Sequence, residues 1–176
     1  CSSATAQRTL KPKHGWSPPG SSPRRSERFA PLSARSMARS PDEPIPEDEP
    51  LYRSVAKEDI DPNLGVLAHS IEMPACSLNR SRYSAPDDVL SASRPKENGI
   101  LEVTPGDLPP PIPRNDAVPY EFFAADDPIE GNDAHCEIRI RRSGSAYNAK
   151  HKPSADIKAK AREALARRMR VKRMPT

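Results

Sequence analysis

The chain has 176 residues, of which 35% are hydrophobic and only 5% aromatic, and it contains 22 prolines. This composition allows one small domain and leaves the rest of the chain with too little apolar surface to offset the entropy of folding. No apolar run approaches the roughly 18 residues that cross a membrane. The three cysteines are far apart and form no C-x-x-C pair, which excludes a zinc ribbon or a dithiol redox motif and is typical of a cytoplasmic protein with reduced thiols.

Charge is distributed in three blocks, although the formal net charge is only +4. Residues 1–41 carry eight Lys and Arg and one acid, residues 42–133 carry seven cations against twenty acids, and residues 134–176 carry thirteen cations against three acids. This asymmetry indicates a basic leader, an acidic body and a basic tail. We expect the tail either to bind a polyanion or to fold back onto the acidic body.

Residues 1–50 are predicted to be disordered. The leader is rich in Ser, Pro and basic residues, and residues 38–50 (ARSPDEPIPEDEP) form an acidic linker in which the density of proline blocks both helix and central strand. Cys1, followed by two serines, matches the processed end of a bacterial lipoprotein. The change of composition at Met37 instead favours Met37 as the natural start.

A single α+β domain of short strands and one or two helices is predicted over residues 51–142. Its strands are expected at residues 51–55 and 99–103, with a strand or a loop at 66–71. A short helix should begin after Ser84, which can cap it, and end before Pro95. The LPPPIP segment at residues 108–113 favours a polyproline connector over a ligand for an SH3-type domain.

The clearest strand covers residues 135–141, where Cys136, Ile138 and Ile140 alternate with polar residues. After it, residues 143–176 are predicted to be a basic linker and a C-terminal helix. Ser154 is a good N-cap, and residues 155–171 are strong helix formers with one apolar stripe.

Three blocks of sequence resemble a family of small uncharacterised bacterial proteins. They are Leu51-Tyr52-Arg53, the segment from Leu78 to Asp87 (LNRSRYSAPD), and Asp127-Pro128 with residues 132–138 (NDAHCEI). The resemblance implies a bacterial, cytoplasmic, single-domain protein from a defence or conflict gene neighbourhood, with a protein partner encoded nearby. It implies no established activity, and neither the basic leader nor the long basic helix belongs to the family pattern.

Polar residues of these blocks are the candidates for a ligand site, because Arg, Asn and His can gather around a phosphate or carboxylate. They are Arg53, Asn79, Arg80, His135 and Glu137. The alternative interpretation is that they are exposed residues, or a buried Arg–Glu pair that fixes the fold. An enzyme hypothesis also stays open, since ADP-ribosyltransferase-like toxins have an Arg, an aromatic or hydroxyl residue and a Glu in the order of Arg53, Tyr83 or Ser84, and Glu137.

The cations of the tail predict a nucleic-acid interface, since binding phosphates releases counterions without any need for base readout. The candidates are Lys158, Lys160, Arg162, Arg167, Arg168, Arg170, Lys172 and Arg173. The alternative is a solvated helix packed on the acidic body. The four histidines have no ligand spacing, so no metal or other cofactor is expected. The function predicted from the sequence is therefore a non-catalytic binding module.

Overall fold

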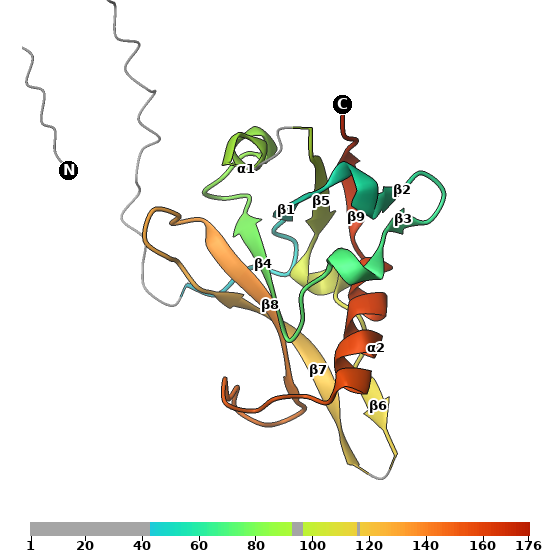
Figure 1. Ribbon diagram of the computed structural model, residues 1–176. Coiled ribbons are helices and arrows are strands. Elements are labelled where there is room, and N and C mark those ends of the chain that lie inside the picture. Colours follow the sequence, from blue (N-terminus) through green and yellow to red (C-terminus); the bar gives the residue numbers. More distant parts are fainter. Residues whose placement is uncertain (1–42, 93–96, 116) are drawn as a thin grey trace, which may run out of the picture. The chain divides into compact units, whose positions relative to one another are not determined.

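The structure is a computed structural model and describes residues 43–92, 97–115 and 117–176. The basic leader, Cys1 and Met37 lie outside the described residues, and the predictions made for them are not addressed by it. Most of the described chain forms a curled, antiparallel, seven-stranded sheet with two helices against it (Figure 1). A small domain of short strands and helices is thus confirmed, although strands outweigh helices more than an α+β domain suggests.

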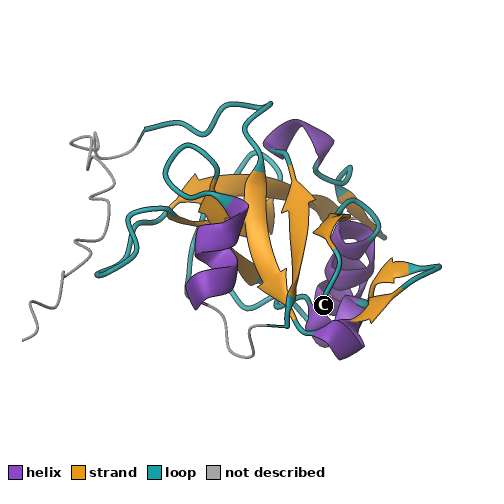
Figure 2. Cartoon of the chain, turned by 90° about the horizontal axis from the view of Figure 1, so that it is seen from above, coloured by secondary structure: helices purple, strands orange, loops and turns teal. Residues whose placement is uncertain are grey.

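The strands of the large sheet lie in the order β6-β7-β8-β4-β1-β5-β9, and a separate two-stranded ribbon joins β2 to β3 (Figures 1 and 2). The strands are β1 (Leu51–Val55), β2 (Ile60–Asp61), β3 (Gly65–Val66), β4 (Ala75–Arg80), β5 (Gly99–Val103), β6 (Ile112–Arg114), β7 (Ala117–Asp126), β8 (His135–Arg142) and β9 (Arg170–Arg173). The helices are α1 (Pro86–Ala92) and α2 (Ala155–Ala166).

The main core lies between one face of the sheet and α2. Leu51, Cys76 and Ile138 are fully buried on the sheet side, and α2 adds Ala161 and Leu165, which are also fully buried. The opposite face of the sheet, which we call the outer face, carries a smaller cluster around Tyr52 under α1. Because the stripe of α2 belongs to the same core as the strands, residues 143–176 are part of the domain and not an appendage to it.

The predicted strand at residues 135–141 is confirmed as β8. Cys136, Ile138 and Ile140 are at most 2% exposed, as their alternation predicts. The strands predicted at 51–55 and 99–103 are also present, as β1 and β5. The polyproline connector leads into the edge strand β6, whose Ile112 pairs with Tyr120 of β7.

Both predicted helices are present, with different ends. Ser154 caps α2, since its side chain accepts a hydrogen bond from the backbone N–H of Ile157. The helix ends at Ala166 and not at 171, because residues 170–173 pair with β5 as strand β9. In α1, the expected cap Ser84 is not used, and the Asp88 carboxylate instead accepts from the N–H of Ala85 at 2.8 Å.

The acidic segment 43–50 differs from the expected disordered linker. Glu49 is 8% exposed and Ile45 packs against the core. The backbone of Glu47 accepts a hydrogen bond from Gly106 at 2.8 Å. We call residues 43–50 the acidic strap. The acidic strap is held mainly by charged groups. A prediction of disorder from low apolar content does not take such contacts into account.

Candidate functional site

Arg80, an expected ligand-binding residue, is the anchor of the acidic strap. Its side chain is 0% exposed. The guanidinium donates to Glu49 at 2.7 and 3.1 Å and to Asp126 at 3.1 Å. Burial alone would lower the pKa of Arg80, but the hydrogen bonds and charge of Glu49 raise it overall, so the group stays charged. These contacts match the alternative of a buried Arg–Glu pair that fixes the fold.

Arg53 lies at the point where strands β1 and β4 stop pairing. Strands β1 and β4 pair only at Leu51↔Arg80 and Tyr52↔Asn79, and then diverge. Arg53 donates to the backbone oxygens of Ser77 at 2.9 Å and Ser70 at 3.3 Å. The guanidinium therefore satisfies the Ser77 carbonyl, where β1 no longer pairs with β4, and ties the turn at Ser70 to it.

Three of the five expected ligand-binding residues line one shallow hollow of about 280 Å³: Arg53, Asn79 and His135. Asn79 faces His135 across the β4–β8 pair. Its side-chain oxygen accepts from Asn132 at 2.9 Å, and His135 Nδ1 lies 2.5 Å from the backbone oxygen of Asp127. Much of the polar lining is thus occupied by contacts within the protein. Arg80 lies outside the hollow.

Glu137 also lies outside this hollow, on the outer face of β8, where it accepts from Arg139 at 2.6 Å. The Arg53 guanidinium is held by the backbone oxygens of Ser77 and Ser70. Tyr83 donates to Glu43 of the acidic strap at 2.6 Å, a hydrogen bond that raises the pKa of Tyr83. Arg53, Tyr83 and Glu137 are thus each held by different partners, and these contacts do not favour the ADP-ribosyltransferase hypothesis. Ser84, its other hydroxyl candidate, is only 7% exposed.

Five of the eight cations expected to bind nucleic acid have acidic partners. Strand β9 pairs its cations with acids of the body: Arg170 with Asp107 at 3.2 Å, Lys172 with Glu102 at 3.0 Å, and Arg173 with Asp87. On α2, Lys160 pairs with Asp156 and Arg167 with Glu163. Such exposed pairs contribute little stability, but they compensate the local charge. The end of the tail thus folds back onto the acidic body.

Other cations have no acidic partner within the described residues. They are Arg114, Arg142, Lys150, Lys152, Lys158, Arg162 and Arg168. Three of them lie in residues 142–152, between the end of β8 and the start of α2, which we call the basic loop. Its cations Arg142, Lys150 and Lys152 are all exposed. Uncompensated positive charge is thus concentrated here.

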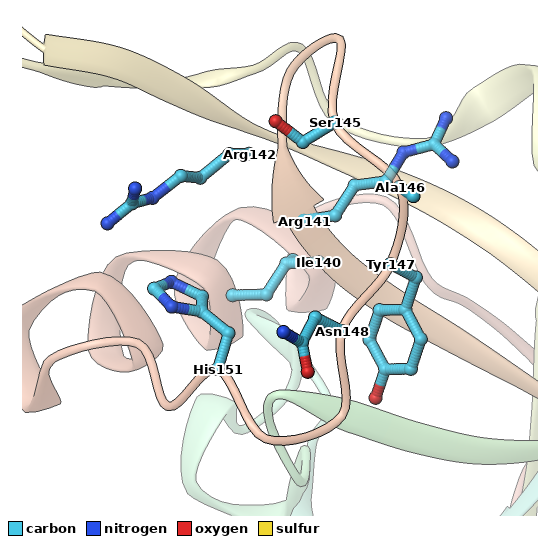
Figure 3. A pocket seen from close by; sticks show the side chains of 8 residues that line it. All are labelled: Ile140, Arg141, Arg142, Ser145, Ala146, Tyr147, Asn148 and His151. Carbon is cyan, nitrogen blue, oxygen red and sulfur yellow. The ribbon is translucent and has the colours of Figure 1, made fainter.

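A hollow of about 210 Å³ lies between the end of β8 and the basic loop. Figure 3 shows Arg142 and His151 on one side of it, Tyr147 on the other, and Asn148 between them. The Tyr120 hydroxyl and His151 Nε2 lie 2.5 Å apart, within hydrogen-bond distance. The guanidinium of Arg142 and the amide of Asn148 supply donors. The lining therefore suits an anionic group such as a phosphate.

Beside this hollow, two aromatic rings and two guanidinium groups meet on the outer face of β7 and β8. Phe123 and Tyr147 contact edge to face, with ring centres 5.5 Å apart. The guanidinium of Arg141 lies 4.6 Å from the centre of the Phe123 ring, and that of Arg139 lies 4.9 Å from the centre of the Tyr147 ring. We call these four residues the Arg–aromatic surface. The sequence analysis missed it, because Phe123 and Tyr147 come together only through strand pairing.

Glu121 fixes one edge of this surface. It accepts from Arg141 Nε at 2.7 Å, and this hydrogen bond, together with one from the backbone amide of Gly144, holds the pKa of Glu121 below its usual range. Gly144 has a φ of 71°, in the left-handed region that favours glycine, where the chain turns out of β8. Glu121 therefore stays ionised and holds both Arg141 and the start of the basic loop.

In the described part of the chain, no group of three or more His, Cys, Asp or Glu is arranged to hold a metal ion. None of the helices described is long and apolar enough to span a membrane. Comparison with known proteins finds no match to any family model, curated protein or solved structure.

Proposed function

We propose that this protein is a non-catalytic binding module that holds the phosphates of a nucleic acid against the basic loop. The observation that carries the proposal is the concentration of exposed cations at Arg142, Lys150 and Lys152, for which the described part of the chain provides no acidic partner. The acidic body repels a polyanion, whereas this loop concentrates positive potential at one side of the sheet. The proposal also includes three cations in and just after α2, namely Lys158, Arg162 and Arg168, for which the described residues provide no acidic partner.

A binding function also fits the size of the two hollows that the candidate residues line. The hollow at the basic loop has a volume of about 210 Å³ and the one on the outer face about 280 Å³. Pockets that enclose a small-molecule substrate usually have volumes of about 300–1,000 Å³. Open hollows below this range suit contact with part of a larger molecule.

The test compares sets of substitutions that remove equal charge. Arg142→Gln, Lys150→Gln and Lys152→Gln together remove the basic loop's unpaired cations. The matched control combines Arg170→Gln, Lys172→Gln and Arg173→Gln in β9, whose cations have acidic partners. Binding of a fluorescent 20-nucleotide single strand and a 20-base-pair duplex is followed by anisotropy between low and physiological salt.

We expect the wild type to lose affinity steeply as salt rises, with a log–log slope of about −0.7 per phosphate contacted on a single strand and about −0.9 on a duplex. In the loop variant the slope should become shallower by the equivalent of up to three phosphate contacts, and the affinity should fall at least about tenfold. The β9 control should keep most of both. A third variant, carrying Lys158→Gln, Arg162→Gln and Arg168→Gln, measures how much α2 contributes.

Two results would overturn the proposal. One is the absence of binding at low salt, which would leave the basic tail with a structural role or a protein partner. The other is an equal loss of affinity in the loop variant and the β9 control, which would show that binding depends on net charge alone. Circular dichroism of each variant checks that the fold is retained.

A further inference from the structure

The Arg–aromatic surface consists of planar aromatic and guanidinium groups and carries little net charge. Arg139 is held by Glu137 at 2.6 Å and by Asp127 at 2.5 Å, and Arg141 is held by Glu121. Burial alone would lower the pKa of Arg139, but its hydrogen bond and charge interaction with Glu137 raise it overall. These guanidinium planes are therefore fixed in orientation and largely compensated in charge.

Fixed guanidinium planes and half-exposed aromatic rings are the groups on which unpaired bases stack. Phe123 and Tyr147 are both only partly buried, and they meet at 5.5 Å without closing over each other. A phosphate gains little from a surface whose cations already have acidic partners, whereas a neutral base can stack on it.

Tyr147 joins this surface to the donors around the basic loop. It belongs to the Arg–aromatic surface and it also lines the hollow with Arg142 and His151 (Figure 3). A nucleotide likewise presents a flat base and an anionic phosphate on either side of its sugar. In a duplex the faces of the bases are covered by their neighbours, so only an unpaired strand can use both features.

We infer that the nucleic acid bound here is single-stranded, with bases stacked on Phe123, Tyr147 and the guanidinium planes of Arg139 and Arg141, and with phosphates at the basic loop. This inference rests on the proposed function and narrows it to one class of ligand. It assigns specificity to the outer face of β7 and β8, and affinity for phosphate to residues 142–152.

The test uses three probes of equal length and label: a 12-nucleotide single strand, an abasic strand with the same phosphates but no bases, and a 12-base-pair duplex. We expect the wild type to bind the single strand about 5- to 150-fold more tightly than the abasic strand, the range typical of one stacked base. Phe123→Leu, which does not alter the lining of the hollow at the basic loop, should remove much of this difference and leave binding to the abasic strand nearly unchanged. Tyr147→Ala should lower binding to the single strand more than binding to the abasic strand. Tyr147→Phe keeps the ring and should preserve the difference.

Equal affinity of the wild type for the single strand and the abasic strand would overturn the inference while leaving the proposed function intact. So would equal or tighter binding of the duplex. Absence of binding to all three probes would overturn both. The comparison of probes on the wild type needs no substitution, so these outcomes do not depend on whether a variant folds. Among the variants, Phe123→Leu keeps an apolar side chain of similar volume.

Discussion

Replacing Arg80 by Met should sharply destabilise the protein, because Arg80 holds two carboxylates from distant parts of the chain. Its side chain is 0% exposed, and the side chains of Glu49 and Asp126 are each 7% exposed. Without the guanidinium, Glu49 and Asp126 would each lose a buried ion pair. Removing one partner of a buried ion pair typically costs about 3–5 kcal/mol. The whole stability of a domain is only about 5–15 kcal/mol.

Urea denaturation followed by far-UV circular dichroism measures this loss. With a slope of about 2 kcal/mol per molar urea, a loss of about 3–5 kcal/mol lowers the midpoint by about 1.5–2.5 M. The matched control is Arg82→Met, because the side chain of Arg82 is 54% exposed and pairs with Glu43 of the same acidic strap. An exposed pair of this kind contributes about 0–1 kcal/mol, so the midpoint should move by less than about 0.5 M.

A further variant separates loss of the pair from loss of packing. The double variant Arg80→Met with Glu49→Met removes both charges of the buried Arg80–Glu49 pair. It should therefore be more stable than Arg80→Met alone. The reasoning would be refuted if Arg80→Met cost no more than Arg82→Met. It would also be refuted if the double variant were as unstable as the sum of the two single changes.

Three other predictions concern titration, thiol burial and the core. The pKa of Glu121 is lowered in the folded state, so its contribution to stability is present above the carboxyl's ordinary pKa and is lost as pH falls through the folded pKa. The difference in melting temperature between wild type and Glu121→Gln should therefore be seen at pH 7 and disappear near pH 2. Burial raises the pKa of the Cys76 thiol, so Cys76 should resist iodoacetamide at pH 8 in the native state and react in urea, and modification at the rate of free glutathione would contradict this. Leu165→Ala should cost about 2–5 kcal/mol in urea denaturation because Leu165 is 0% exposed, whereas the exposed Arg167→Ala should cost less than about 0.5 kcal/mol.

The sequence predicts elements well where one local pattern determines them. Strand β8 alternates apolar and polar residues over its length, and α2 has both a cap at Ser154 and an apolar stripe. Strand β4 was missed because the third residue on its buried face is Arg80, a charged side chain whose burial depends on the acidic strap. The start of β9 was predicted as helix because Arg170 to Arg173 show no alternation typical of a strand. These residues form a strand because they pair with the edge of β5.

The candidate site depended still more on long-range pairing. Strand β7 places Phe123 opposite Arg139, and the turn at Gly144 returns the chain so that Tyr147 meets both. Neither contact follows from spacing along the chain. The net charge of the tail was visible in the sequence, but which cations have acidic partners was not, because the partners Asp107 and Glu102 lie far away in the chain.

The placement of α2 and β9 has a consequence for synthesis of the chain. A nascent chain that has reached residue 142 contains the first eight strands, yet it lacks the helix that covers the main core and the strand that completes the β5 edge. Until residues 143–173 emerge, an apolar face that includes Leu101 and Ile138 stays open to solvent and to other chains. Folding can therefore be completed only after synthesis passes β9, and a ribosome stalled before that point would carry a species that chaperones bind and proteases degrade.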